Sequence, residues 1–304
     1  MTQDRPVLGI ILMLGFCVLA PLGDGMAKLL GETTALGLLV LVRFAVQAMI
    51  LIPLIAMTGK PWKMMPRVLR LTMIRTLLHI IGIAAMFTAL QYMPLADTVA
   101  IAFVMPFIML LLGKYVLGEQ VGPRRLVACV VGFIGTLLVI QPSFAQVGAP
   151  ALLPLIVAVV FALFMLVTRQ IAKETDPVAL QAVSGAMATA FLLPIVLLGS
   201  QIGLPAMSLT MPTGETLWLL LGIGVLGTVA HLLMTWSLRY APSATLAPMQ
   251  YLEIPVATLI GWLIFHDLPN GLAALGIGIT IAAGLYVILH ERANARSGPT
   301  ETPA

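Results

Sequence analysis

The stretch Tyr92-Met93-Pro94-Leu95-Ala96 returns 148 positions later as Tyr240-Ala241-Pro242-Ser243-Ala244. The same offset aligns two further pairs, Gly113 with Gly261 and Glu119 with Asp267. A match that persists at one fixed offset indicates an internal duplication. The chain therefore consists of two related halves.

Long apolar segments surround both copies of this stretch. The chain has 304 residues, of which 60% are hydrophobic and only 9% are charged, whereas soluble domains average about 25% charged residues. Lipid must therefore be the solvent for most of the chain, in which a spanning helix needs about 20 apolar residues. Ten segments qualify: 7–27, 35–57, 72–91, 95–117, 125–141, 150–170, 178–199, 215–238, 243–265 and 271–289. The predicted fold class is an all-α membrane protein of ten transmembrane helices.

Each half contains five of these segments, over residues 7–141 and 150–289. Because five is odd, the two halves enter the membrane from opposite sides and form inverted repeats. Inverted repeats are typical of secondary transporters, which bind their solute near the membrane midplane between the halves. The polar segment 290–304 is expected to be a disordered cytoplasmic tail.

The basic residues predict the orientation. If the N-terminus is cytoplasmic, 14 of the 16 Lys and Arg residues fall on the cytoplasmic side, as the positive-inside rule requires. Both termini are then cytoplasmic. The net charge of +4 reflects these short loops and does not indicate a nucleic-acid partner.

The fifth and tenth segments each carry small residues four positions apart. The two sets are Ala128, Gly132 and Thr136, and Gly276, Thr280 and Gly284. Such ridges allow helices to approach closely in lipid. The ridges predict tight packing of the fifth and tenth helices, within the fold or between the subunits of a homodimer.

A further set of motifs is spread over nearly the whole chain: residues 89–97 (ALQYMPLAD), Pro106, residues 247–255 (APMQYLEIP), Gly261-Trp262 and Asp267-Leu268-Pro269. At these motifs the chain resembles the drug/metabolite transporter superfamily in its ten-helix EamA branch. The resemblance implies a central cavity among helices one to four and six to nine, with helices five and ten at the periphery. It also implies transport of amino acids, nucleotide-like metabolites, vitamins or drugs, by exchange or proton coupling.

Residues 8–29 are similar to bacterial members of this branch, some of them linked to riboflavin uptake. The resemblance therefore implies a bacterial cytoplasmic (inner) membrane as the location. It suggests a vitamin such as riboflavin as the substrate.

Glu253 lies midway along the ninth segment. A charge at the bilayer centre costs roughly 2.5–3.5 kcal/mol, so it must face a cavity, have a partner or be protonated. Glu253 is accordingly a candidate for substrate binding or proton coupling, and the alternative is a protonated or paired structural residue. Gln250 lies on the same helical face, and Tyr251 offers an aromatic surface nearby.

Arg43 lies within the second segment, with Gln47 one turn later on the same face. Because Arg keeps its proton, it needs an anion, either a substrate or a fixed partner such as Asp24 or Glu253. Asp24 is itself a candidate site residue, between Gly23 and Gly25. Its spacing to Lys28 also permits a helical ion pair.

Four other polar residues lie in the apolar segments. Asp97 is expected to be an N-cap, and Arg75 is expected to extend toward lipid phosphates or a loop. His79 and His231 are either proton relays or hydrogen-bonding contacts between helices. Residues 222–227 fit the pattern GxGxxG but follow no strand, so they do not predict a nucleotide site.

An intramembrane lipid-modifying enzyme is the alternative function. Such an enzyme needs clustered carboxylates, metal ligands or a nucleophile with a base, whereas the acids here are single and lie on different segments. No catalytic residue, metal site or cofactor is predicted. The sequence predicts a secondary transporter of a small organic metabolite.

Overall fold

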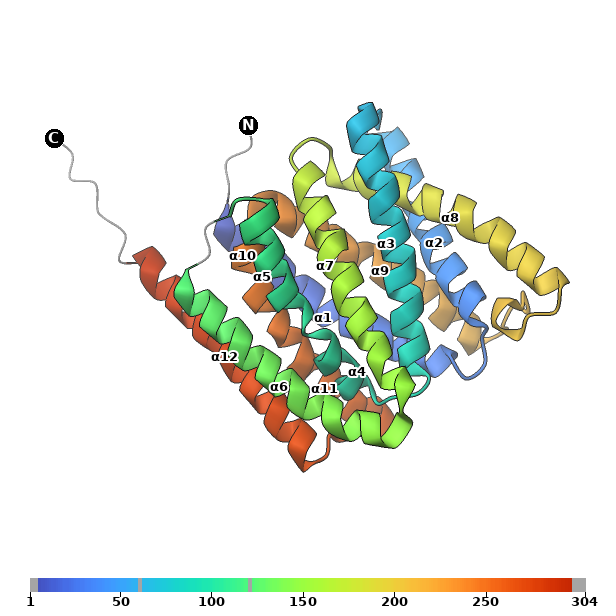
Figure 1. Cartoon of the computed structure of the whole chain (residues 1–304). Coiled ribbons are helices and arrows are strands. Elements are labelled where there is room, and N and C mark those ends of the chain that lie inside the picture. The colour runs from blue at the N-terminus through green and yellow to red at the C-terminus, as the bar shows by residue number, and fades with distance from the viewer. Residues whose placement is uncertain (1–4, 60–61, 120–121, 297–304) are drawn as a thin grey trace.

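The computed structural model describes residues 5–59, 62–119 and 122–296, and these residues form helices joined by short connections (Figure 1). The first half comprises α1 (Pro6–Leu30), α2 (Leu36–Thr58), α3 (Pro66–Leu90), α4 (Leu95–Ala102), α5 (Met105–Val116) and α6 (Pro123–Val147). The second half comprises η1 (Ala149–Leu152), α7 (Leu153–Ile171), α8 (Pro177–Gln201), η2 (Pro205–Met207), α9 (Glu215–Tyr240), α10 (Ser243–Leu246), η3 (Ala247–Leu252), α11 (Glu253–Phe265) and α12 (Gly271–Arg296).

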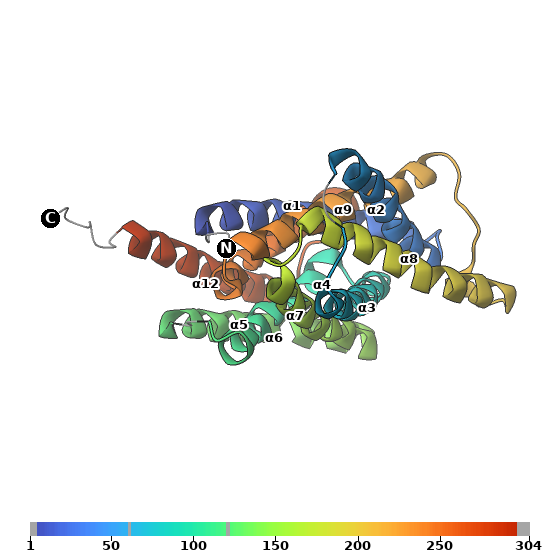
Figure 2. The same ribbon diagram turned by 90° about the horizontal axis from the view of Figure 1, so that it is seen from above.

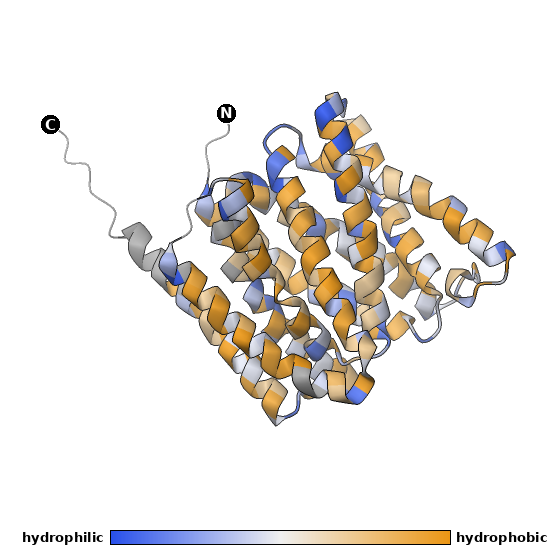
Figure 3. Ribbon diagram, viewed as in Figure 1, coloured by the Kyte–Doolittle hydropathy of each residue, from blue (hydrophilic) through white to orange (hydrophobic). Residues whose placement is uncertain are grey.

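The described helices account for the ten predicted spans. Eight helical segments are long and apolar enough to cross a membrane, with α4 and α5 counted as one segment. The ninth and tenth spans correspond to two shorter apolar stretches, Met249–Phe265 and Gly271–Tyr286. Hydrophobic residues cover the helices, and hydrophilic residues gather at their ends (Figure 3). The chain is therefore an all-α, multi-pass membrane protein.

One end of the last helix differs from the prediction. α12 continues to Arg296, well into the segment 290–304 that was expected to be disordered. Residues 297–304 lie outside the described part of the chain. In Figure 1 the start of α1 and the end of α12 lie on the same side of the bundle as the start of α3 and the α7–α8 connection.

The fourth member of each repeat is broken. Between α4 and α5, Pro106 cannot donate a backbone hydrogen bond to Ala102, so the helix is interrupted at Phe103 and Val104. In the second repeat the corresponding span has a 3₁₀ segment, η3, between α10 and α11. Breaks at equivalent positions in two repeats are typical of transporters near their solute site.

Most helix packing joins one repeat to the other. The first helix of each repeat packs along the third helix of the other, α1 on α9 and α7 on α3. The second helices pack on each other as α2 and α8, and the fifth helices do so as α6 and α12. If the helices of one repeat are exchanged for those of the other, the same set of helix pairs results. This symmetry is what an inverted duplication requires. Figure 2 shows α1 and α9 on one side of the molecule and α3 and α7 on the other.

The small-residue ridge on α12 packs within the fold, against α6. The backbones meet at Gly135 and Gly276, and a Cβ added to Gly135 would lie 2.6 Å from the Gly276 carbonyl oxygen. The hydroxyl of Thr280 lies 3.5 Å from the carbonyl oxygen of Gly132, while Gly132 itself faces the ring of Tyr251. The predicted packing of the fifth and tenth helices is therefore present inside one chain. A homodimer through these helices stays a prediction.

Gly276→Leu is expected to destabilise the folded protein, because any side chain there meets the α6 backbone, which cannot move aside cheaply. Overpacking of this kind costs about 1–3 kcal/mol. Gly278→Leu on the same helix is the matched control, since a Cβ at Gly278 meets nothing within 4 Å. Only Gly276→Leu should lower the temperature at which the protein unfolds in detergent. Equal melting of the two variants would contradict the close approach of α6 and α12.

Candidate functional site

A cavity lies between the repeats, near the breaks in their fourth helices. Its walls come from α1, α2, α3, α4, α5, α7, α9, η3 and α11. The lining residues are Phe16, Leu19, Ala20, Gly23, Asp24, Arg43, Ile83, Met86, Phe87, Val99, Ala102, Phe103, Met105, Val157, Phe161, Met165, Ile223, Gly227, Ala230, His231, Met234, Gln250 and Glu253. Both repeats thus contribute to one site.

The cavity is narrow in this conformation. The space inside it that the centres of water molecules can occupy is about 80 Å³. This is room for a few waters. Four phenylalanines and four methionines line it, and five polar side chains, from Asp24, Arg43, His231, Gln250 and Glu253, reach it. Thioether sulfur and aromatic rings pack well against flat apolar ligands, while the polar groups can orient a ligand.

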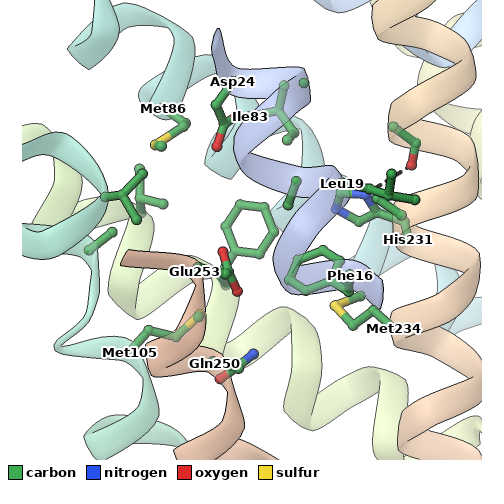
Figure 4. Close-up of a pocket in the computed structure, with 18 of the residues that line it drawn as sticks. Phe16, Leu19, Asp24, Ile83, Met86, Met105, His231, Met234, Gln250 and Glu253 are labelled. Atoms are coloured by element: carbon green, nitrogen blue, oxygen red, sulfur yellow. Dashed lines mark hydrogen bonds between the residues drawn. The ribbon is translucent and has the colours of Figure 1, made fainter. Parts of the chain in front are cut away.

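Glu253 begins α11, directly after the 3₁₀ segment η3. Its carboxyl points into the cavity, with Gln250 on one side of it and Asp24 on the other (Figure 4). Its side chain is only 8% exposed, and its Oε1 has no hydrogen-bond partner among the described residues. A buried acceptor without a partner is costly, so this atom is suited to bind a donor from a solute or to carry a proton.

Asp24 also reaches the cavity, from α1. The sequence spacing permitted an ion pair between Asp24 and Lys28, but that expectation is wrong. Lys28 donates to the carbonyl oxygen of Met93 at 2.8 Å and pairs with Asp267 at 3.5 Å. The Asp24 carboxylate consequently remains available at the cavity wall.

Arg43 contacts a histidine in place of a carboxylate. Its Nη2 lies 3.0 Å from Nδ1 of His231, and its Nη1 has no hydrogen-bond partner among the described residues. The suggested fixed ion pair with Asp24 or Glu253 is not formed in the described part of the chain. The same Nδ1 lies 3.0 Å from the carbonyl oxygen of Gly227. Because a guanidinium only donates and a carbonyl oxygen only accepts, the two contacts make opposite demands on this nitrogen. The guanidinium occupies space left by the missing side chain of Gly227, where a Cβ would lie 2.9 Å from Cζ of Arg43.

The other two predicted site residues lie behind the cavity wall. The amide of Gln47 donates to the backbone carbonyl oxygen of Gln181 at 2.7 Å. Tyr251 is 1% exposed and packs against Gly132 of α6 and the ring of Phe103. Asp24, Arg43, Gln250 and Glu253 therefore converge on the cavity, whereas Gln47 and Tyr251 do not reach it.

Arg75 departs from its expected position at the membrane surface. It is fully buried and donates to hydroxyls on three helices of the second repeat, those of Thr168, Ser184 and Thr235. Asp97 likewise does not cap its helix, and its Oδ2 instead accepts a hydrogen bond from Ser143 of α6. Arg75 thus links the first repeat to the second, whereas Asp97 links two neighbouring spans of the first repeat.

His79 and His231 lie against each other with their ring centroids 4.3 Å apart and their ring planes tilted by 33°. Neither ring nitrogen of His79 has a hydrogen-bond partner among the described residues. His79 also contacts the rings of Phe44 and Phe164. This pairing was missed because each histidine appears alone in its own segment of the sequence.

Comparisons with known proteins agree with this architecture. The sequence pattern of the EamA-like transporter family matches residues 7–141 and 149–289. A riboflavin transporter from Rhizobium johnstonii is 30% identical over 79% of this chain and 74% of its own length. A riboflavin transporter from Vibrio cholerae is 26% identical over 84% of each chain.

Other relatives carry a different solute. An S-adenosylmethionine uptake transporter from Rickettsia prowazekii is 23% identical over 95% of each chain. A crystal structure with a TM-score of 0.70 shares the fold at 18% identity and covers 94% of this chain and 98% of its own. The chain belongs to the EamA-like transporter family of the drug/metabolite transporter superfamily, and it is a transporter and not an enzyme.

Proposed function

We propose that this protein is a secondary transporter that carries a flat aromatic metabolite by alternating access, with riboflavin as the first candidate. The proposed location is a bacterial cytoplasmic membrane, with both termini on the cytoplasmic side. The cavity between the repeats carries this proposal, because it joins aromatic and thioether walls to a few inward polar groups. Its narrowness implies that the repeats separate to admit the solute.

The proposed roles follow from the chemistry of each group. Glu253 and Asp24 accept hydrogen bonds from hydroxyl or N–H groups of the solute, and the amide of Gln250 can both donate and accept. The Nη1 of Arg43, which has no hydrogen-bond partner in the described part of the chain, donates to a solute carbonyl. Gln47 and Tyr251 support the site from behind, Gln47 through Gln181 and Tyr251 at Gly132 and Phe103.

S-adenosylmethionine is the second candidate. Asp24 and Glu253 form no ion pair within the described residues, and an unpaired carboxylate favours a positively charged solute. The sulfonium and ammonium groups of S-adenosylmethionine provide such charges, and its adenine provides a flat ring. Riboflavin has the flat ring and no positive charge, so the two compounds test different features of the cavity.

Counterflow in proteoliposomes tests the substrate. Vesicles loaded with unlabelled riboflavin are expected to accumulate labelled riboflavin transiently, because exchange through one site needs no ion gradient. Labelled S-adenosylmethionine is measured in the same way, and protein-free liposomes serve as the control. If neither compound exchanges through folded, reconstituted protein, the proposed substrates are wrong.

A further inference from the structure

Two turns at opposite faces of the bundle have the same geometry. Each follows the fourth member of a repeat, and in each an acidic residue comes directly after a residue with positive φ. Gly118 (φ 66°) precedes Glu119, and His266 (φ 56°) precedes Asp267. The backbone N–H of each acid bonds the glycine carbonyl six residues earlier, at 3.0 Å for Glu119 and 3.2 Å for Asp267.

Each acid pairs with a base from the first helix of the opposite repeat. Lys28 of α1 pairs with Asp267 at 3.5 Å and donates to the carbonyl oxygen of Met93, after α3. Arg169 of α7 pairs with Glu119 at 3.6 Å and donates to the carbonyl oxygen of Leu238, near the end of α9. The two acids are equivalent at the 148-residue offset, and each base comes from the first helix of the opposite repeat, although the bases and the carbonyl acceptors do not correspond residue by residue. The two ion pairs therefore join equivalent elements of the inverted duplication.

Each ion pair joins two helices that also line the cavity. The Lys28–Asp267 pair connects α1 to the end of α11, and the Arg169–Glu119 pair connects α7 to the end of α5. A path from the cavity to either face requires such helices to separate at that face. We propose that the two ion pairs are alternating closures of the cavity, one at each face, and that each breaks when its own face opens. This inference rests on the alternating access proposed above.

The two closures are unequal in strength. Glu119 also accepts hydrogen bonds from the backbone N–H and the hydroxyl of Ser243, at 3.2 and 2.6 Å. The equivalent of Ser243 in the first repeat is Leu95, which has no hydroxyl to donate. The side chains of Arg169 and Glu119 are 13% and 12% exposed, against 19% and 39% for Lys28 and Asp267. The face closed by Lys28 is thus the one that opens more readily.

A cysteine placed in the cavity can report which face is open. Ala20→Cys is suitable because Ala20 lies on the cavity-lining face of α1, between Phe16 and Asp24. The background carries Cys17→Ala and Cys129→Ala, which removes both native thiols. Labelling by a membrane-impermeant maleimide is then measured in vesicles of each orientation.

Breaking one ion pair should increase labelling from one side only. Asp267→Asn is expected to raise the labelling rate from the Lys28 face by about two- to fivefold, as a partly exposed ion pair allows. Glu119→Gln is expected to raise labelling from the opposite face, by a larger factor because this ion pair is more buried and the bonds from Ser243 lose their charge assistance. Glu174→Gln is the matched control, since it breaks the Arg67–Glu174 pair away from the cavity.

Exchanging the charges separates a closure from a general loss of stability. The double variant Lys28→Asp with Asp267→Lys should lower labelling from the rate of the single variant toward the parent rate, because the ion pair is restored while the bond from Lys28 to the carbonyl oxygen of Met93 is not. Unchanged labelling in both single variants, or an equal increase from both faces, would overturn the inference. The assay needs no substrate, so side-specific labelling would stand even if neither riboflavin nor S-adenosylmethionine were transported. If the protein transports its solute but labelling does not change in the ion-pair variants, the inference about the closures is wrong and the proposed function stands.

Discussion

Glu253→Gln is expected to reduce concentrative uptake of riboflavin strongly while leaving insertion and folding intact. The substitution keeps the shape of the side chain and removes its ability to carry a negative charge or release a proton. A hydrogen bond to a charged group contributes about 1.5–3 kcal/mol, so its loss should lower uptake by roughly tenfold to more than a hundredfold. The measurement is riboflavin uptake into energised proteoliposomes that contain equal amounts of folded protein.

The pattern of loss distinguishes two roles for Glu253. If it binds the solute, counterflow at equal pH should fall together with pH-driven accumulation. If it only couples transport to protons, counterflow should survive. Glu215→Gln is the control, because Glu215 is an exposed acid at the start of α9. Wild-type uptake and pH dependence in a well-folded Glu253→Gln protein would remove Glu253 from the site.

Local sequence patterns predicted the fold because its determinants are local. Each apolar segment can be recognised as a spanning helix from its own length, and the duplication is visible as matches at one fixed offset. The ridge at Gly276 and Thr280 correctly predicted tight packing, because small residues allow close approach whatever their partner. The breaks near Pro106 and in residues 247–252 follow from the missing backbone donor of proline.

The partners of polar residues were harder to predict, since they come from distant segments. Lys28 is four residues from Asp24, yet it pairs with Asp267, 239 positions away. Arg75 lies near a helix end in the sequence, but hydroxyls from three helices surround it. In lipid a buried charge is placed by the helices packed around it, and helical spacing alone does not identify them. The sequence singles out four rare polar residues in apolar segments, namely Asp24, Arg43, Gln250 and Glu253. It does not show that they line the same cavity.

The GxGxxG pattern of α9 has a packing explanation that sequence could not supply. A Cβ on Gly222 would meet the side chain of Met26, and one on Gly224 would meet Val46. Gly227 leaves room for the guanidinium of Arg43. These glycines let α9 lie close to α1 and α2, so the pattern reflects helix contacts and the position of one charged group.

Gly227→Ala should therefore impair transport strongly through a single methyl group. The added Cβ would lie 2.9 Å from both Cζ and Nε of Arg43, so the guanidinium must leave its position beside His231. The lost hydrogen bond to a charged group contributes about 1.5–3 kcal/mol, and uptake of riboflavin should fall by roughly tenfold or more. Initial uptake rates in proteoliposomes provide the measurement.

Gly222→Ala on the same helix is the matched control. Its Cβ would meet only the terminal methyl group of Met26, 2.7 Å away, at the end of a flexible side chain that can move aside. Alanine also favours a helix over glycine by about 1 kcal/mol, so this control should melt no lower than the wild type and transport normally. If Gly227→Ala transports as well as Gly222→Ala, the position of the Arg43 guanidinium is not needed for transport. If both variants lose activity together, close contact of α9 with its neighbours, and not Arg43, is the requirement.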